Sequence, residues 1–166
     1  MTTIILVVDG EPRWTQQAVH LAGAMARESG AEVLILEMVP VARLEYLGAG
    51  LREPLLNYAT YETLHEHVAT VQSYGVAATV STYEFTDYIS GLCSAAEQIS
   101  PLAVFAPAPR ATLRALAALR LWRLRRGVGC PLYTLGPGEP AAVLVTAPTE
   151  RATPEARPAR SSLGAR

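Results

Sequence analysis

The chain has 166 residues, of which 50% are apolar, and its formal net charge is -1. Length and composition predict one globular domain and exclude a disordered chain. All 14 basic residues are arginines, which excludes a Schiff-base lysine and the lysine of a phosphate-binding P-loop. Four of these arginines and one glutamate lie in residues 151–166, so the rest is mildly acidic and nucleic-acid binding is not expected.

The first third of the chain alternates apolar runs with one amphipathic segment. Residues 4–8 are a continuous β-branched and leucine run, typical of a strand buried on both faces. Thr15 is the expected N-cap of a helix over residues 16–29, which Gly30 ends. Residues 32–39 predict a second strand. The stripe expected to be buried on the helix is Ala18, Leu21, Ala22 and Met25.

The alternation continues to residue 135, after residues 41–54, which show no period and are expected to form a loop. Further strands are predicted over 76–84, 102–106 and 130–135, and further helices over 55–73, after Thr86 as N-cap, and over 113–126. Such alternation indicates right-handed crossovers and a parallel sheet covered on both faces.

The C-terminal part breaks this rhythm. The turn GPGEP at 136–140 precedes an apolar run, residues 141–147, which predicts a sixth strand antiparallel to the fifth. From Pro148 onward only Leu163 is a large apolar residue. We therefore expect a domain over 1–147 and a disordered tail over 148–166. No export signal or membrane-length run is visible, so a cytoplasmic protein without a membrane partner is expected.

Three motifs carry a resemblance to a known family: Val8-Asp9-Gly10-Glu11, GAEVLILEMVP at 30–40, and GCPLYTL at 129–135. In their order and spacing they resemble the universal stress protein family over about residues 3–135. The resemblance implies an open α/β sheet of five parallel strands in the order 3-2-1-4-5, with helices on both faces. It implies a ligand crevice between the first and fourth strands, where Asp9 faces the turn at 106–110.

Nucleotide-binding members of that family resemble one another in a G-x2-G-x9-G-[ST] signature after the fourth strand. Its four positions fall here on Ala106, Pro109, Leu119 and Arg120, and none matches. Pro107 and Pro109 also lack the backbone N–H that a phosphate would need. The resemblance therefore implies a non-catalytic stress-response module that acts through protein contacts, with no bound ATP and no other cofactor.

A nucleotide- or anion-binding regulator is the alternative. Arg110, Arg114 and Arg120 follow the lost glycine positions and could hold an anion by side chain, with Asp9 nearby. The competing interpretation is that these arginines form a solvated helix face. An enzyme is not expected, because no nucleophile–base set and no metal-ligand spacing is visible.

The main apolar face of the predicted fourth helix is expected to consist of Leu113, Leu116, Ala117, Leu121 and Leu124. Two further apolar residues, Leu119 and Trp122, point away from that face and lie beside arginines. Such a patch is typical of a protein-contact surface, although burial under the sixth strand or the tail would also account for it. A homodimer is expected at the edge of the sheet, through Tyr133 and, from the sixth strand, Val143 and Val145. That strand could fold back on its own fifth strand or cross to the partner; pairing across the dimer is preferred, because Val143 and Val145 would otherwise form an exposed apolar edge.

Overall fold

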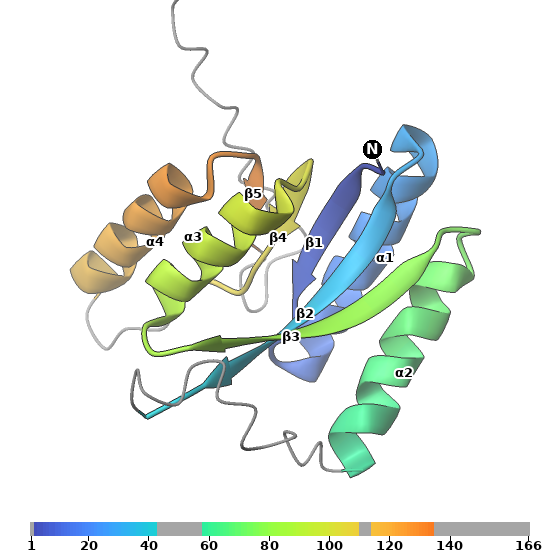
Figure 1. Ribbon diagram of the computed structural model, residues 1–166, viewed down its shortest axis with the longest axis horizontal. Helices are drawn as coiled ribbons and strands as arrows, with labels where there is room; N and C mark the ends of the chain where they lie inside the picture. Colours follow the sequence, from blue (N-terminus) through green and yellow to red (C-terminus); the bar gives the residue numbers. More distant parts are fainter. Residues whose placement is uncertain (1, 43–57, 110–113, 135–166) are drawn as a thin grey trace, which may run out of the picture.

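The computed structural model of the chain describes residues 2–42, 58–109 and 114–134. They form one parallel sheet between two pairs of helices, α1 with α2 on one face and α3 with α4 on the other (Figure 1). The strands are β1 (Ile4–Val8), β2 (Glu32–Pro40), β3 (Ala78–Phe85), β4 (Ala103–Phe105) and β5 (Leu132–Tyr133). The helices are α1 (Pro12–Ser29), α2 (Tyr58–Gln72), α3 (Tyr88–Ile99) and α4 (Arg114–Val128).

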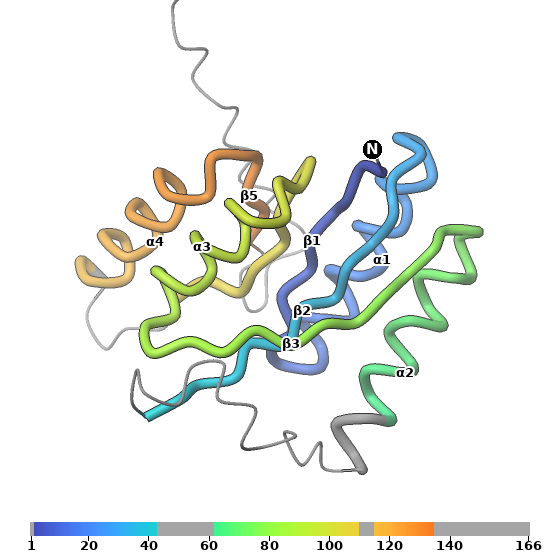
Figure 2. Tube along the Cα trace, viewed as in Figure 1, coloured from blue at the N-terminus to red at the C-terminus, as the bar shows by residue number. Residues whose placement is uncertain are grey.

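The strand order is β3-β2-β1-β4-β5, and every pair is parallel. The predicted fold class is confirmed. Figure 2 follows the path: the chain winds from β1 outward through β2 to β3, then returns to the other side of β1 for β4 and β5. The winding direction therefore reverses between β1 and β4, and the residues that follow these two strands lie at the reversal point.

Each face of the sheet has its own apolar core, as expected for strands that are buried on both sides. Under α1 and α2 lie Ile5 and Val7 of β1, with Phe105 of β4. Under α3 and α4 lie Leu6 and Val8, together with Leu124 of α4. The alternation of β1 between the two cores explains why its sequence is apolar throughout.

Helix α1 begins four residues earlier than predicted. Its first residue is Pro12, which has the backbone angle of a first helical turn and loses no hydrogen bond there. Thr15 is therefore not the N-cap but a fully buried residue of the helix. The predicted stripe was also partly wrong: Leu21 is 37% exposed. The buried residues are Thr15, Ala18, Val19, Ala22, Gly23 and Ala26.

Three other expectations at helix ends and faces can be compared with the structure. Gly30 ends α1 in the left-handed region with φ 67°, as predicted. The N-cap of α3 is Asp87, not Thr86, because the Asp87 carboxylate accepts the Ser90 N–H at 2.9 Å. On α4, Leu116 was expected inside but is 43% exposed.

Several predicted segments lie outside the described residues: most of the loop at 41–54, the sixth strand at 141–147 and the tail at 148–166. The division at residue 147 thus stays a prediction. Among the helices that the structure describes, none combines the length and apolar character needed to cross a bilayer.

Candidate functional site

The candidate site lies where β1 and β4 end and the winding reverses, the usual position of ligands in open α/β sheets. Asp9 directly follows β1, and its backbone N–H still donates to the Leu36 carbonyl oxygen of β2 at 2.8 Å. The sheet ladder therefore fixes the backbone of Asp9. On the other side of the reversal, the Ala106 N–H donates to the Tyr133 carbonyl oxygen of β5 at 3.1 Å.

Thr15 of α1 holds the side chain of Asp9 and the following turn. The Thr15 hydroxyl donates to Oδ1 of Asp9 at 3.0 Å and accepts the Gly10 N–H at 2.9 Å. A buried hydroxyl of the next helix thus binds the Asp9 carboxylate. Asp9 is thus held in place by the fold, with part of its carboxylate left for other contacts.

Pro107, in the turn that follows β4, lies close to Gly10, in the turn that follows β1. A Cβ placed on Gly10 would lie 3.2 Å from Cγ of Pro107 and 3.6 Å from Cε3 of Trp14. The proline ring therefore packs against the turn that follows β1, beside the indole. Ala106, which stands at the first glycine position of the nucleotide signature, is fully buried.

Two titratable residues near Asp9 were not predicted as site residues. His67 of α2 is only 5% exposed, and burial lowers its pKa below 6.5 although Asp9 and Glu66 act in the opposite direction. Glu37 of β2 has a pKa raised above 4.5, first by burial and then by the Asp9 charge. The fold thus brings Glu37 and His67 close enough to Asp9 for its charge to affect the protonation of both.

Some buried polar atoms of Glu37, His67 and the nearby Trp14 lack hydrogen-bond partners among the described residues. Nε2 of His67, Oε2 of Glu37 and Nε1 of Trp14 are buried without a partner among the described residues. Glu37 also lines a hollow of about 520 Å³ between α2 and β3. The sequence held a signal for both missed residues: Glu37 follows Val33 and Ile35 at a period of two, and His67 lies between Leu64 and Val71 at helical spacing.

Replacing His67 by Phe is expected to weaken the dependence of stability on pH between about 5.5 and 7.5. The pKa of the folded state lies below that of the unfolded chain, so the unfolded chain binds the proton more tightly. The stability present above pH 6.5 is therefore lost as the pH falls through 6.5 toward the folded pKa. Glu37, whose pKa is raised, contributes the opposite trend, so the difference between wild type and variant isolates the imidazole.

Urea unfolding at several pH values measures this effect. The matched comparison is His65→Phe, the same substitution at an exposed histidine of the same helix. If His67→Phe and wild type lose stability in parallel as the pH falls, the buried imidazole is not responsible.

Of the three predicted arginines, only Arg120 has a described side chain. Arg110 lies outside the described residues, and of Arg114 only its place as the first residue of α4 is described. Arg120 is exposed and contributes, with Arg123, to lowering the pKa of Asp87, which two hydrogen bonds from Ser90 lower most. Asp87 caps α3, on the opposite face of the sheet from α1.

The residues predicted for protein contacts differ in how exposed they are. Leu119 is 51% exposed and Trp122 is 52% exposed. Tyr133 stacks on Phe105 with ring centroids 4.8 Å apart, and it is partly buried. Val143 and Val145 lie outside the described residues.

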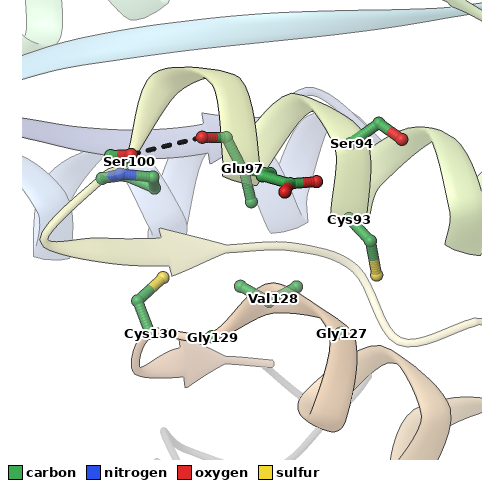
Figure 3. A pocket seen from close by; sticks show the side chains of 10 residues that line it. Cys93, Ser94, Glu97, Ser100, Gly127, Val128, Gly129 and Cys130 are labelled. Atoms are coloured by element: carbon green, nitrogen blue, oxygen red, sulfur yellow. Dashed lines mark hydrogen bonds between the residues drawn. The ribbon is translucent and has the colours of Figure 1, made fainter.

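The two cysteines line a second hollow, of about 530 Å³. It lies where β4 and β5 begin, at the end of the sheet opposite to Asp9. In Figure 3, Cys93 of α3 and Cys130 lie on opposite sides of Val128. Burial raises the pKa of Cys93, and it raises that of Cys130 to about 11. Both thiols are thus protonated near neutral pH and are poor nucleophiles. Within the described ranges, no three His, Cys, Asp or Glu side chains are arranged to hold a metal ion.

Comparisons with known proteins find matches to the fold but not to the sequence. No family model and no curated protein matches the sequence. Solved structures do match: a universal stress protein in complex with cAMP superposes with a TM-score of 0.61 at 14% identity, over 81% of this chain and 97% of that one. The chain has the universal stress protein fold.

Two further structures agree with this assignment. The universal stress protein from Archaeoglobus fulgidus in complex with dAMP has a TM-score of 0.58 at 14% identity, over 82% of this chain and 98% of its own. A member of the universal stress protein family from Burkholderia pseudomallei has a TM-score of 0.52 at 22% identity, over 80% of this chain and 95% of its own. The resemblance seen in the sequence motifs is thus confirmed at the level of the fold.

Proposed function

We propose that this universal stress protein-like chain is a non-catalytic regulatory module of a stress response, which acts through protein contacts and without bound ATP. The observation that carries the proposal is the closeness of Pro107 to Gly10 in the turn that follows β1. The two turns that would have to hold an adenosine therefore contact one another. A phosphate would also meet two prolines that have no N–H to donate.

The surroundings of Asp9 support the same proposal. One carboxylate oxygen already accepts the hydroxyl of a fully buried threonine, Thr15, which also accepts the Gly10 N–H. These contacts explain Asp9 as the residue that joins the end of β1 to α1. No ligand is needed to account for its position.

The proposal includes a homodimer formed at the edge of the sheet. β5 is the last strand in the order, and it pairs with β4 on one side. A strand edge needs a partner or a cover. The segment at 141–147 would supply either a cover or an exchanged strand, as expected from its sequence.

Nucleotides are expected to leave the melting temperature unchanged within about 1 °C, because a ligand stabilises a protein only by binding its native state. The measurement is a thermal-shift titration with ATP, cAMP and dAMP. For a chain of this size, binding at 100 times Kd would add about 2.7 kcal/mol, or roughly 5 to 10 °C. A shift of that size with any of these nucleotides would overturn the proposal.

Inorganic phosphate tests the anion-binding alternative in the same assay. That alternative is favoured by the absence of acidic residues in the first turn of α4, which follows Arg110 and begins with Arg114. It predicts a shift with phosphate as well as with nucleotides, and loss of the shift in Arg110→Gln/Arg114→Gln. The main proposal predicts no shift with either.

A further inference from the structure

The outer face of α4 carries large apolar side chains in contact with solvent. Leu116, Leu119 and Trp122 are 43%, 51% and 52% exposed. The opposite face anchors the helix, since Leu124 is fully buried and Val128 is 6% exposed, both in the core under α3 and α4. In Figure 1, α4 forms the end of its helix layer, with α3 on one side only.

Arginines lie within this apolar surface as well as beside it. With about 3.6 residues per turn, Leu119, Trp122 and Arg126 follow one another along one line of the helix. Cζ of Arg126 lies 5.0 Å from the centre of the Trp122 ring, so the guanidinium covers part of the indole. Arg120 and Arg123 flank the line on one side. The outermost line of α4 therefore carries two apolar residues followed by one cationic residue.

The charge of α4 is of one sign. Its sequence, RALAALRLWRLRRGV, contains five arginines and no acidic residue. Arg125 and Arg126 lie in the last turn, where cations favour the helix dipole. Arg120 and Arg123 lie before the last turn of α4, so the helix dipole does not explain why these two positions are arginines. Asp87 is a neighbouring acidic group, and both of these arginines contribute to lowering its pKa.

This charge argues against three occupants of the surface. A second copy packed helix against helix would bring the exposed Arg120, Arg123 and Arg126 toward the same three arginines of the other copy. The C-terminal residues 151–166 hold four arginines and one glutamate, so they are repelled as well. A lipid surface requires an apolar outermost line with the cations drawn back to the flanks, whereas Arg126 here lies on the line itself.

We propose that the outer face of α4 docks an acidic amphipathic helix of a partner protein. The apolar side chains of that helix pack on Leu119 and Trp122, and its carboxylates meet Arg120, Arg123 and Arg126. Trp and Arg are the residue types in which interface energy concentrates, and guanidinium groups bind carboxylates with two parallel hydrogen bonds. The inference rests on the proposed function through protein contacts and names the partner's chemistry.

The probe for this surface is a dye-labelled helical peptide of about 15 residues, the length of α4, with leucines at helical spacing and glutamates at the other positions. Fluorescence anisotropy measures its binding to the full chain. We expect saturable binding that weakens as salt is added. A matched peptide with lysine in place of glutamate should not bind, since α4 repels it.

Separate variants test the apolar and the cationic residues of the surface. Trp122→Ala and the pair Arg120→Gln/Arg123→Gln are each expected to weaken binding about tenfold or more. The matched controls are Leu102→Ala, an exposed leucine that precedes β4, and Arg27→Gln in the last turn of α1. Both should bind the peptide as the wild type does. Circular dichroism and melting temperature establish that each variant is folded.

Three results would overturn the inference. If the glutamate and lysine peptides bind equally well, or if neither binds, the outer face of α4 does not select an acidic partner. Dimerisation that light scattering shows to be lost in Trp122→Ala would assign the surface to a second copy. Binding to phosphatidylserine vesicles, lost in the same variant, would assign it to a lipid surface. A nucleotide-induced thermal shift bears on the proposed function alone, so the two failures are distinguishable.

Discussion

Phe105→Ala is expected to lower the free energy of unfolding by about 3 to 5 kcal/mol, the usual cost of removing a buried phenyl ring. Phe105 is the last residue of β4 and is 1% exposed. It packs in the core under α1 and α2 and stacks on Tyr133 of β5, with 15° between the ring planes. The substitution therefore leaves a cavity next to the point at which Pro107 meets Gly10.

Urea unfolding monitored by circular dichroism measures this loss. Leu102→Ala is the control, because Leu102 lies three residues earlier and is 44% exposed. Its expected effect is within about 0.5 kcal/mol, as for most surface substitutions. If the two variants are equally stable, the position of Phe105 between the sheet and α1 is wrong.

Leu124→Ala is expected to cost about 2 to 5 kcal/mol, because Leu124 is fully buried between α4 and the sheet. Leu119→Ala on the same helix changes the same side chain at 51% exposure, and it should change stability by about 0.5 kcal/mol or less. The pair compares the anchored face of α4 with its free face, since both substitutions have the same effect on helix propensity.

Chemical unfolding of the two α4 variants under identical conditions gives the comparison. A large loss in Leu119→Ala would show that this side chain is covered by another part of the chain. In that case the outer face of α4 is not available for a partner. Equal losses in the two variants would mean that the helix is rotated about its axis relative to the structure described.

The positions of the strands along the chain were predictable because each strand has a clear local pattern. Residues 4–8 are apolar at every position, which marks β1 as a central strand, and β1 spans the predicted residues. The sequence-based end of β2 differs from the observed end by one residue. The order β3-β2-β1-β4-β5 came from the resemblance to the family, since local patterns do not specify which strands pair.

Helix faces and caps were less predictable, because neighbouring elements decide them. Thr15 has the residue type of an N-cap, but Pro12 starts the helix earlier and the carboxylate of Asp9 then holds the hydroxyl. On α4, leucines occur on both sides, so the period did not show which side packs on the sheet. Leu116 was assigned inward for this reason and is exposed.

The candidate site was predictable only in part. Asp9 and the turn after β4 were expected at the same point of the sheet, and the contact of Pro107 with the turn at Gly10 agrees with that arrangement. Glu37 and His67 come from β2 and α2, and their nearness to Asp9 depends on the packing of three elements. No single stretch of sequence contains that information.

The nucleotide content of the freshly purified chain tests the central claim most directly. Denaturation releases any bound nucleotide, which chromatography with ultraviolet detection then quantifies. Because Pro107 packs against the turn at Gly10 and Ala106 replaces the first signature glycine, we predict no nucleotide above the background of a matched blank. Release of about one adenine nucleotide per chain would contradict the account.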